Sequence, residues 1–412
     1  MIRHIGKLIW NQRKRNGWIV AELFLVFIIL WYIIDELMVT SKVFFAPQGF
    51  NTEHVYQVNF GFQPGEGALS SIGEIQLQLL ERLKTCPGVE YACAGYAAMP
   101  FDGQNSVYTY YVLTQDSVNS KGINAKTLQI TPEYMNVFGF KAMDKQTNWA
   151  DKLSNHNIII SYDLLERMKE YGGSQDFGLT ASTGNQEENK ISISGVTTPF
   201  RSERFTKDAI WVFEELRNED IISRNTPLKF AIRVKPEADH DFESFFFQQM
   251  ENQLSIGPLY LMELTSFKDK RTAYEFLTGE KAEVEKKLAI SIFLLVNIFL
   301  SIIATFWYRT DQRTNEIGLR MAMGSSRNKV KRLIKTEGIL LLTFICIPAI
   351  IICLNIQLFE LNNQYYMDYT GGRFLLSIGC TYIFIIGMIL LGTHIPAKRA
   401  SKLQPAEALH NE

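Results

Sequence analysis

Several common catalytic signatures are missing from this sequence of 412 residues. It contains no G-x-x-x-x-G-K-[ST] phosphate loop, no G-x-S-x-G nucleophile turn and no H-E-x-x-H zinc helix. No acid pair or histidine stands out as a general acid or base, and the six histidines are scattered without metal-ligand spacing. The chain is therefore predicted not to be an enzyme, with no catalytic residue, no cofactor site and no metal site.

Cysteine and net charge are also scarce. Three of the five cysteines lie in apolar segments, where a thiol behaves as a small hydrophobe. Cys86 and Cys93 lie in the polar middle of the chain and form a candidate disulfide, which the intervening Pro87-Gly88 turn permits but does not require. The formal net charge of −1 gives no reason to expect a nucleic-acid partner.

Apolar residues are concentrated near the N-terminus and in the last third of the chain. Four runs are long enough for most or all of a membrane span at about 1.5 Å per residue. They are predicted as transmembrane helices at 17–38, 288–308, 336–356 and 374–394. A cleaved signal peptide is the alternative for the first, but its apolar run is long and no small-residue cleavage site follows it.

The middle of the chain, residues 41–265, has the pattern of a soluble α+β domain. Period-two alternation and short apolar runs indicate strands, and helical spacing indicates helices. The expected strands are Val55–Phe62, Val89–Ala97, Val107–Leu113, Asn157–Ile160, Ile191–Thr197, Ala209–Phe213 and Lys229–Val234. The expected helices are Ser70–Lys84, a short one opening at Thr131, Ser161–Lys169 and Asp239–Met250.

The order of these elements predicts the fold class. We expect an integral membrane protein with four transmembrane α-helices and a large α+β extracytoplasmic domain of two lobes between helices 1 and 2. The polar, helix-prone residues 266–287 contain no proline and one glycine, so a stalk helix is expected to continue from the domain into the second span.

A cationic loop at 309–335 predicts the orientation in the membrane. Residues 309–338 carry eight Lys or Arg and three acids. Because Lys and Arg next to a span resist translocation, this loop is expected in the cytoplasm. The link at 357–373 is poor in basic residues, whereas the tail at 395–412 has several near the membrane. Both termini are therefore expected in the cytoplasm and the large domain in the periplasm, across a cell inner membrane.

Two further features of the N-terminal part concern the membrane. Residues 1–16 have five basic residues and no acid. They fit either a cytoplasmic amphipathic helix in contact with membrane lipid or a simple cationic flank. Glu22 lies about one turn inside the first span, where an acid either reaches back to the cytoplasmic face or pairs with a cation on a neighbouring helix. It is a candidate membrane acid with a functional role.

Inside the cationic loop, residues 315–324 are predicted to form a short amphipathic helix that ends at a glycine. Glu316 and Arg320 are spaced i, i+4 and are expected to pair on one face. Ile317 and Met321 form the adjoining apolar face. Composition alone also fits a solvated hairpin that only obeys the positive-inside rule.

At this loop the sequence resembles the FtsX-like permease family of ABC transporters, in its MacB-type class. The family pattern R-x-x-E-I-G-x-R-x-A-x-G-A is matched from Arg313 to Gly324 and departs at Ser325, where the family has alanine. A second family pattern, P-A-x-x-A-x-x-x-x-P-x-E-A-L, is matched from Pro396 to Leu409. The middle of the chain is also similar to a MacB-like periplasmic domain, with an inserted outer lobe expected at about 98–205.

The resemblance implies a mechanism called mechanotransmission. ATP would be bound and hydrolysed by a separate dimer of ABC ATPase subunits, and this chain, with a second permease subunit, would carry the motion to the periplasmic domain. The resemblance assigns ATPase docking to the short cytoplasmic helix, at Arg313, Glu316, Ile317, Gly318, Arg320, Met321, Ala322 and Gly324.

Two functions follow from this resemblance. The first is an ABC transporter permease subunit that exports or extracts a periplasmic or membrane substrate such as a lipoprotein, a peptide or a toxic compound, with a periplasmic adaptor or outer-membrane channel among its partners. The second is a non-transporting FtsX-like regulator of an extracytoplasmic enzyme such as a cell-wall hydrolase. A membrane receptor is disfavoured because no cytoplasmic output domain is present.

Overall fold

The computed structural model describes residues 13–63, 72–103, 106–114, 118–144, 148–153, 157–181, 190–204, 209–362, 367 and 370–394. It divides into two compact units, one of Met1–Phe45 with Ala282–Glu412 and the other of Ala46–Lys281. Most of the N-terminal segment and the tail motif at Pro396–Leu409 lie outside the described residues.

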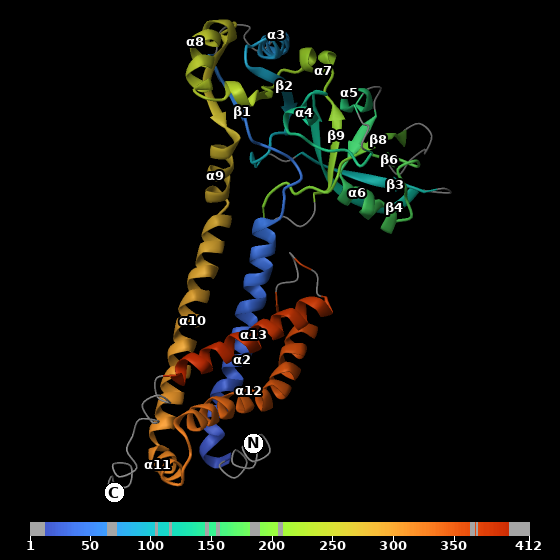
Figure 1. Ribbon diagram of the computed structural model, residues 1–412. Helices are drawn as coiled ribbons and strands as arrows, with labels where there is room; N and C mark the ends of the chain where they lie inside the picture. Colours follow the sequence, from blue (N-terminus) through green and yellow to red (C-terminus); the bar gives the residue numbers. More distant parts are fainter. Residues whose placement is uncertain are drawn as a thin grey trace. The chain divides into compact units, whose positions relative to one another are not determined.

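The first unit is built from membrane helices. Within the described residues, four helices are long and apolar enough to cross a membrane. They are α2 (Arg13–Phe45), α10 (Glu280–Asp311), α12 (Arg327–Leu358) and α13 (Gly371–Gly392), and the short α11 (Thr314–Ala322) connects α10 to α12 (Figure 1). The predicted fold class, with four spans and a large α+β domain between the first and the second, is confirmed.

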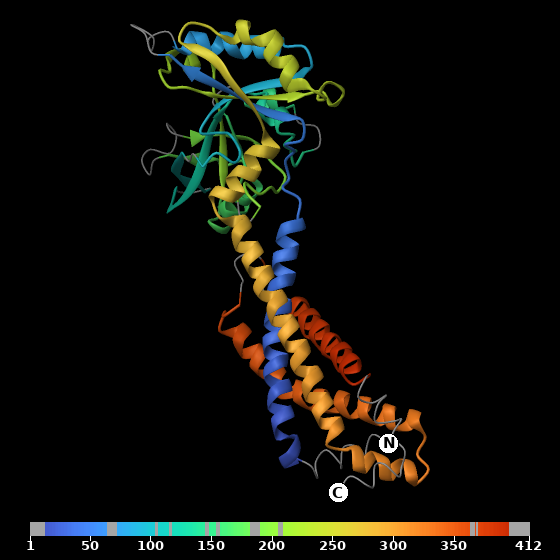
Figure 2. The same ribbon diagram turned by 90° about the vertical axis from the view of Figure 1, so that its left-hand side faces the viewer.

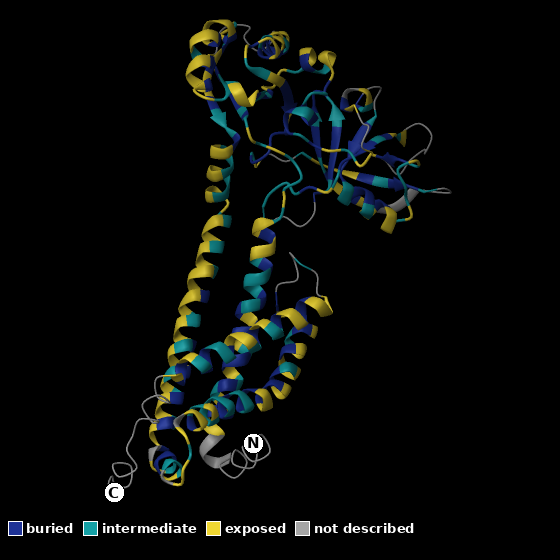
Figure 3. Cartoon of the chain, in the orientation of Figure 1, coloured by how far each residue is buried: buried dark blue, intermediate teal, exposed yellow. Residues whose placement is uncertain are grey.

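Helices α2, α12 and α13 share most of the buried side chains of the membrane unit. Phe27 and Trp31 of α2 are fully buried, as are Leu342 of α12 and Ile389 of α13. Helix α10 buries a narrower stripe whose members are one turn apart, namely Ile298, Ile302 and Phe306. The rest of α10 faces away from the other helices along most of its length (Figure 3).

Gly338 explains how α12 comes close to its neighbours. A Cβ added at this position would lie 2.8 Å from Ile389 of α13 and 2.9 Å from Phe306 of α10. A larger residue would therefore push these helices apart at the level where the cationic loop begins.

The second unit has an inner lobe, an antiparallel sheet in the order β11-β1-β10-β2. Its strands are β1 (Val55–Phe62), β2 (Val89–Tyr96), β10 (Lys229–Val234) and β11 (Leu259–Ser266). The helices α3 (Ile72–Lys84) and α8 (Phe242–Leu254) cover one face of this sheet (Figure 2), and α7 (Asn218–Ser223) packs on α3. A short 3-10 helix, η1 (Pro236–Ala238), follows β10. The hydrophobic core between helices and sheet includes the fully buried Leu79 and Phe246, and Phe230 of β10.

The outer lobe is inserted between β2 and β10. Its strands are β3 (Val107–Leu113), β4 (Val118–Ile130), β5 (Ile158–Ile160), β6 (Leu179–Thr180), β7 (Lys190–Ile191), β8 (Ile193–Val196) and β9 (Trp211–Glu215). Its helices are α4 (Tyr134–Val137), α5 (Trp149–Lys152) and α6 (Tyr162–Glu170). Because β9 pairs in parallel with β4, the lobe extends about ten residues beyond the expected end at 205.

Two strands were not indicated by the sequence pattern. β4 contains Asn, Ser, Lys and Gly and shows no long apolar alternation, yet it pairs with β2, β3 and β9. β11 has a run of apolar residues without clear period, and it pairs with β1 around a bulge at Asn59 and Phe60. β11 pairs with a strand that is distant in sequence, whereas β4 pairs with its neighbour in sequence, β3, as well as with the more distant β2 and β9.

The expectation of one continuous stalk helix is wrong. Helix α9 (Phe267–Leu277) ends before Gly279, and α10 begins at Glu280. Gly279 has a φ of +76°, a conformation that favours glycine and ends helices. The single glycine of the stretch therefore interrupts the stalk.

The candidate disulfide between Cys86 and Cys93 is not formed. Both thiols are free and buried, Cys86 in the core beneath α3 and Cys93 in the core on the other face of β2. Successive residues of a strand point to opposite faces, and Cys93 lies between Ala92 and Ala94, which face the α3 side. Burial raises the pKa of the Cys86 thiol to about 11.

Candidate functional site

The cationic loop forms a compact junction between α10, α11 and α12, centred on Glu337 of α12. Its carboxylate accepts from Arg309 Nη2 of α10 at 2.5 Å and from Arg313 Nη1, just before α11, at 2.5 Å. The Glu337 side chain is 6% exposed, so both ion pairs are shielded from water. One carboxylate therefore joins the end of the second span to the start of the third.

The same junction extends onto α11 through Glu316. Arg313 Nε and Nη2 donate to the Glu316 carboxylate at 2.9 and 3.0 Å, and Arg320 Nη2 donates to it at 2.7 Å. The hydrogen bonds from Arg313 hold the pKa of Glu316 below its usual value, against the effect of burial. For Arg313, burial alone would lower the pKa, but its bonds to Glu316 and the charge of Glu337 raise it. We call the five residues Arg309, Arg313, Glu316, Arg320 and Glu337 the Glu337 cluster.

An apolar seam completes the junction. Ile317 of α11 and Val330 of α12 are buried against each other, with Met321 and Ile334 packed beside them. The space enclosed by the seam and the ion pairs is only about 20 Å³, which holds at most a water molecule. The junction is thus a packed structural joint rather than a pocket for a small ligand.

Gly324 ends α11 in the way its position predicts. It has a φ of +90°, its N–H donates to Met321 O at 3.0 Å, and the N–H of Ser325 donates to Arg320 O at 3.0 Å. These two bonds satisfy carbonyls at the end of the helix, as in a glycine-ended helix of the Schellman type. α12 then begins after Ser326, so a turn of four residues joins the two helices.

The side of α11 that faces away from the junction is formed by Asn315, Leu319 and Met323. These residues are four apart, so they lie on one face of the helix. Leu319 is 50% and Met323 72% exposed. The cationic loop therefore carries two exposed apolar side chains on one face of α11.

The residues to which the resemblance assigned ATPase docking differ in how far they are buried. The predicted Glu316–Arg320 pair is present. Arg313, Ile317 and Gly318, however, are buried in the junction, and Met321 packs on α12. Ala322 is the last residue of α11, and its side chain lies outside the described residues. The docking residues implied by the resemblance did not include the exposed Leu319 and Met323, because a helical pattern alone does not show which face a neighbouring helix covers.

Glu22 of α2 contacts helix α10. Its carboxylate accepts hydrogen bonds from Ser301 Oγ at 2.6 Å and from Thr305 Oγ1 at 2.7 Å, both on α10. It therefore joins α2 to α10 through hydroxyl groups.

A cavity lies beside this contact, between the ends of α2 and α10. It has a volume of about 450 Å³ and is lined by Trp18 and Ile19 of α2 and by Ala304, Thr305, Tyr308, Arg309, Gln312 and Arg313. On the side of Glu22 toward Trp18, the cavity therefore separates α2 from the C-terminal part of α10.

Residues 288–405 match the model of the FtsX-like permease C-terminal family, so this part of the chain is an FtsX-like permease domain. The match includes α11 and the whole Glu337 cluster. The resemblance to FtsX-like permeases predicted from Arg313–Gly324 is confirmed.

The relatives are of the MacB type. The macrolide export ATP-binding/permease protein MacB of Bordetella avium is 25% identical over 126 residues, which cover 30% of this chain and 19% of that protein. The protein of the same name from Pectobacterium atrosepticum is 28% identical over 103 residues, or 24% of this chain and 15% of that protein. These matches span a fifth or less of each relative's length. The periplasmic region of MacB from Actinobacillus actinomycetemcomitans aligns at 10% identity with a TM-score of 0.35, covering 56% of this chain and 97% of that one.

Proposed function

We propose that this chain is the permease subunit of an ABC transporter, which couples ATP hydrolysis on a separate ATPase subunit to movement of its own large domain. The observation that supports this most is the Glu337 cluster within the FtsX-like permease domain. Ion pairs and the Ile317–Val330 seam join α11 to the ends of both α10 and α12. A push on α11 therefore passes into two membrane helices at once.

The partner surface that we assign is the face of Asn315, Leu319 and Met323. An ABC ATPase would bind there, and it would supply the ATP site that this chain is not expected to have. A dimer of ATPase subunits would require a second permease subunit, either another copy of this chain or a close relative. The cationic loop favours the cytoplasm for α11 and the periplasm for residues 46–281.

The movement would serve export or extraction of a periplasmic or membrane substrate. From α10 it would pass through the Thr278–Gly279 break to α9 and the sheet of the inner lobe, since these elements follow one another in the chain. Crosslinking from the outer lobe in cells, followed by identification of the trapped molecule, would identify the class of cargo.

Capture of the cytoplasmic partner tests the proposal. The full chain, purified in detergent, should retain an ABC ATPase, and Leu319→Glu or Met323→Glu should abolish that capture because each places a charge in an apolar contact. Ile222→Glu is the matched control, since Ile222 is 45% exposed on α7 of the large domain. Retention of a kinase instead of an ATPase would rule the proposal out. Movement of a substrate in reconstituted vesicles then separates a transporter from a regulator of an extracytoplasmic enzyme.

A further inference from the structure

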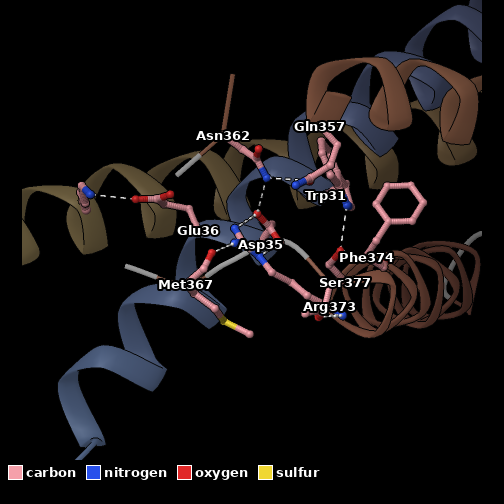
Figure 4. Close-up of polar contacts among 11 residues, drawn as sticks. Trp31, Asp35, Glu36, Gln357, Asn362, Met367, Arg373, Phe374 and Ser377 are labelled. Carbon is pink, nitrogen blue, oxygen red and sulfur yellow. Dashed lines mark hydrogen bonds and ion pairs between the residues drawn. The ribbon is translucent and has the colours of Figure 1, made fainter. Parts of the chain in front are cut away.

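A buried ion pair joins the first and the last membrane helix. Arg373, in the first turn of α13, donates from Nε to Asp35 Oδ1 at 2.9 Å and from Nη2 to Asp35 Oδ2 at 2.5 Å (Figure 4). The Arg373 side chain is 1% and the Asp35 side chain 2% exposed. This bidentate pair is more completely buried than any ion pair of the Glu337 cluster.

The pair also bonds to two residues that lie between α12 and α13 in the sequence, Asn362 and Met367. Arg373 Nη1 donates to the carbonyl of Met367 at 2.7 Å, and Asn362 Nδ2 donates to Asp35 Oδ2 at 3.1 Å (Figure 4). One turn deeper, Trp31 Nε1 of α2 donates to Ser377 Oγ of α13 at 2.9 Å. Two successive turns of α2 are thus bonded to two successive turns of α13.

Burying such a pair between helices costs desolvation free energy. Charged side chains within membrane segments mark functional positions by default, and removing one member of a buried pair leaves an uncompensated charge. Here the pair is well compensated, because each carboxylate oxygen of Asp35 accepts a hydrogen bond from Arg373. Separation of α2 and α13 would break both hydrogen bonds of this buried pair, so the pair opposes separation of the two helices.

Helix α10 is attached to α2 by weaker contacts. The neighbouring acid, Glu36, pairs with Lys287 of α10 at 2.7 Å, but the Lys287 side chain is 40% exposed and water can replace its partner. A further polar contact in the part of the chain that the structure describes joins the Glu22 carboxylate to the hydroxyls of Ser301 and Thr305. The 450 Å³ cavity lies beside it, which leaves room for α10 to shift.

We propose that Asp35 and Arg373 are positioning residues that hold α2 and α13 as one body, against which α10 moves. This inference rests on the proposed function, since it assigns the moving helix in the same transmission of force. The two adjacent acids of α2, Asp35 and Glu36, would have different roles. Asp35 makes a contact that is kept through the cycle, and Glu36 makes one that can be exchanged.

Spin-label distances in the full chain, in lipid nanodiscs with its ATPase, test this assignment. Labels replace the exposed Leu25 on α2, Ile383 on α13 and Leu300 on α10 in a background without native cysteines. In the unaltered protein, the α2–α13 distance should be the same with and without ATP, and the α2–α10 distance should change. An ATP-dependent change in the α2–α13 distance would overturn the inference.

The variants separate a positioning role from a merely structural one. In Asp35→Asn, the α2–α13 distance distribution should broaden and the ATP-dependent shift of α10 should be lost, while ATPase capture stays intact. Glu36→Gln is the matched control and should leave the α2–α13 distance unchanged. If Asp35→Asn behaves like Glu36→Gln, the pair has no positioning role.

Two further variants cover the case in which Asp35→Asn does not fold. Arg373→Lys keeps the charge but not the bidentate geometry, and it should broaden the same distribution in a folded chain. The exchange Asp35→Arg with Arg373→Asp should narrow it again, and failure of both would overturn the inference. Loss of ATPase capture in the unaltered chain would contradict the proposed function instead, and the ATP-free α2–α13 distribution would still decide the role of the pair.

Discussion

The Glu337 cluster and the Asp35–Arg373 pair are two solutions to keeping charges among membrane helices. The first is a branched set of three arginines and two glutamates, which becomes more exposed toward α11. The second is a single bidentate pair with almost no access to water. A branched cluster can lose one contact and keep the others, whereas a sealed pair is either complete or broken. The first therefore suits a joint that receives force, and the second a contact that must not change.

The sealed pair should show the largest effect when one member is removed. Arg373→Met or Asp35→Leu leaves a buried charge without its partner, so each should lower the free energy of unfolding by about 3–5 kcal/mol. The double variant removes both charges and should recover most of that loss. Thermal or denaturant unfolding of the four proteins in detergent measures this cycle. Additive losses would show that the two charges do not depend on each other.

Glu337→Gln should have the next largest effect, because both Arg309 and Arg313 lose a charged acceptor. A loss of roughly 2–3 kcal/mol is expected, less than for the sealed pair since Arg313 keeps Glu316. The variant should also uncouple ATP hydrolysis from movement of α10 while the ATPase remains bound. Gln357→Glu, elsewhere on α12, is not a suitable control because Gln357 is itself buried near Asp35. Lys329→Gln, exposed in the first turn of α12, is suitable.

Lys270 of the large domain is a third kind of buried charge, one that is incompletely compensated. It hydrogen-bonds Gln57 and lies 3.7 Å from Asp102, which also binds Lys229. Burial lowers the pKa of Lys270 to about 8 from an ordinary value of 10.5.

Because the folded state releases this proton first, stability should rise as pH increases from about 8 to 10.5. The slope should be at most about 1.4 kcal/mol per pH unit. Lys270→Met should abolish this slope in pH-dependent unfolding of the full chain, and a slope that persists would assign it to another group.

Glu316 should show the smallest effect, because its side chain is 31% exposed. Its lowered pKa means that the ionised form stabilises the fold above the unfolded pKa, and that this contribution is lost as pH falls through the folded value. Glu316→Gln should cost about 1 kcal/mol or less at neutral pH and should reduce the loss of stability in acid. A cost as large as that of Glu337→Gln would show that the cluster is not graded from α12 to α11.

The two units differ in how far local patterns foretold them. The spans follow from hydropathy alone, because a membrane requires about twenty apolar residues in a row whatever their neighbours are. In the large domain, strands with clear alternation such as β1 and β10 were expected, but β4 was not, since its polar residues form a strand only between β2, β3 and β9. The stalk break at Gly279 could have been placed by weighting that glycine as a helix end.

For the candidate sites, sequence separation set the limit of prediction. The Glu316–Arg320 pair is four residues apart on one helix, so a single sequence indicates it. Asp35 and Arg373 are separated by 338 positions, and no pattern in one sequence matches a particular acid to a particular base across that distance. Glu337 was counted only as one acid in a cationic loop.

Four spans, a cationic loop with a short amphipathic helix, and the motif of an FtsX-like permease can all be predicted from the sequence alone. These properties depend on composition and on residues within a few turns of one another. The uncovered face of α11, the burial of each ion pair, and the low burial of α10 among the four membrane helices became visible only in the folded chain. Those properties depend on the packing of helices against one another, because burial and partners belong to the folded chain and not to any segment of it.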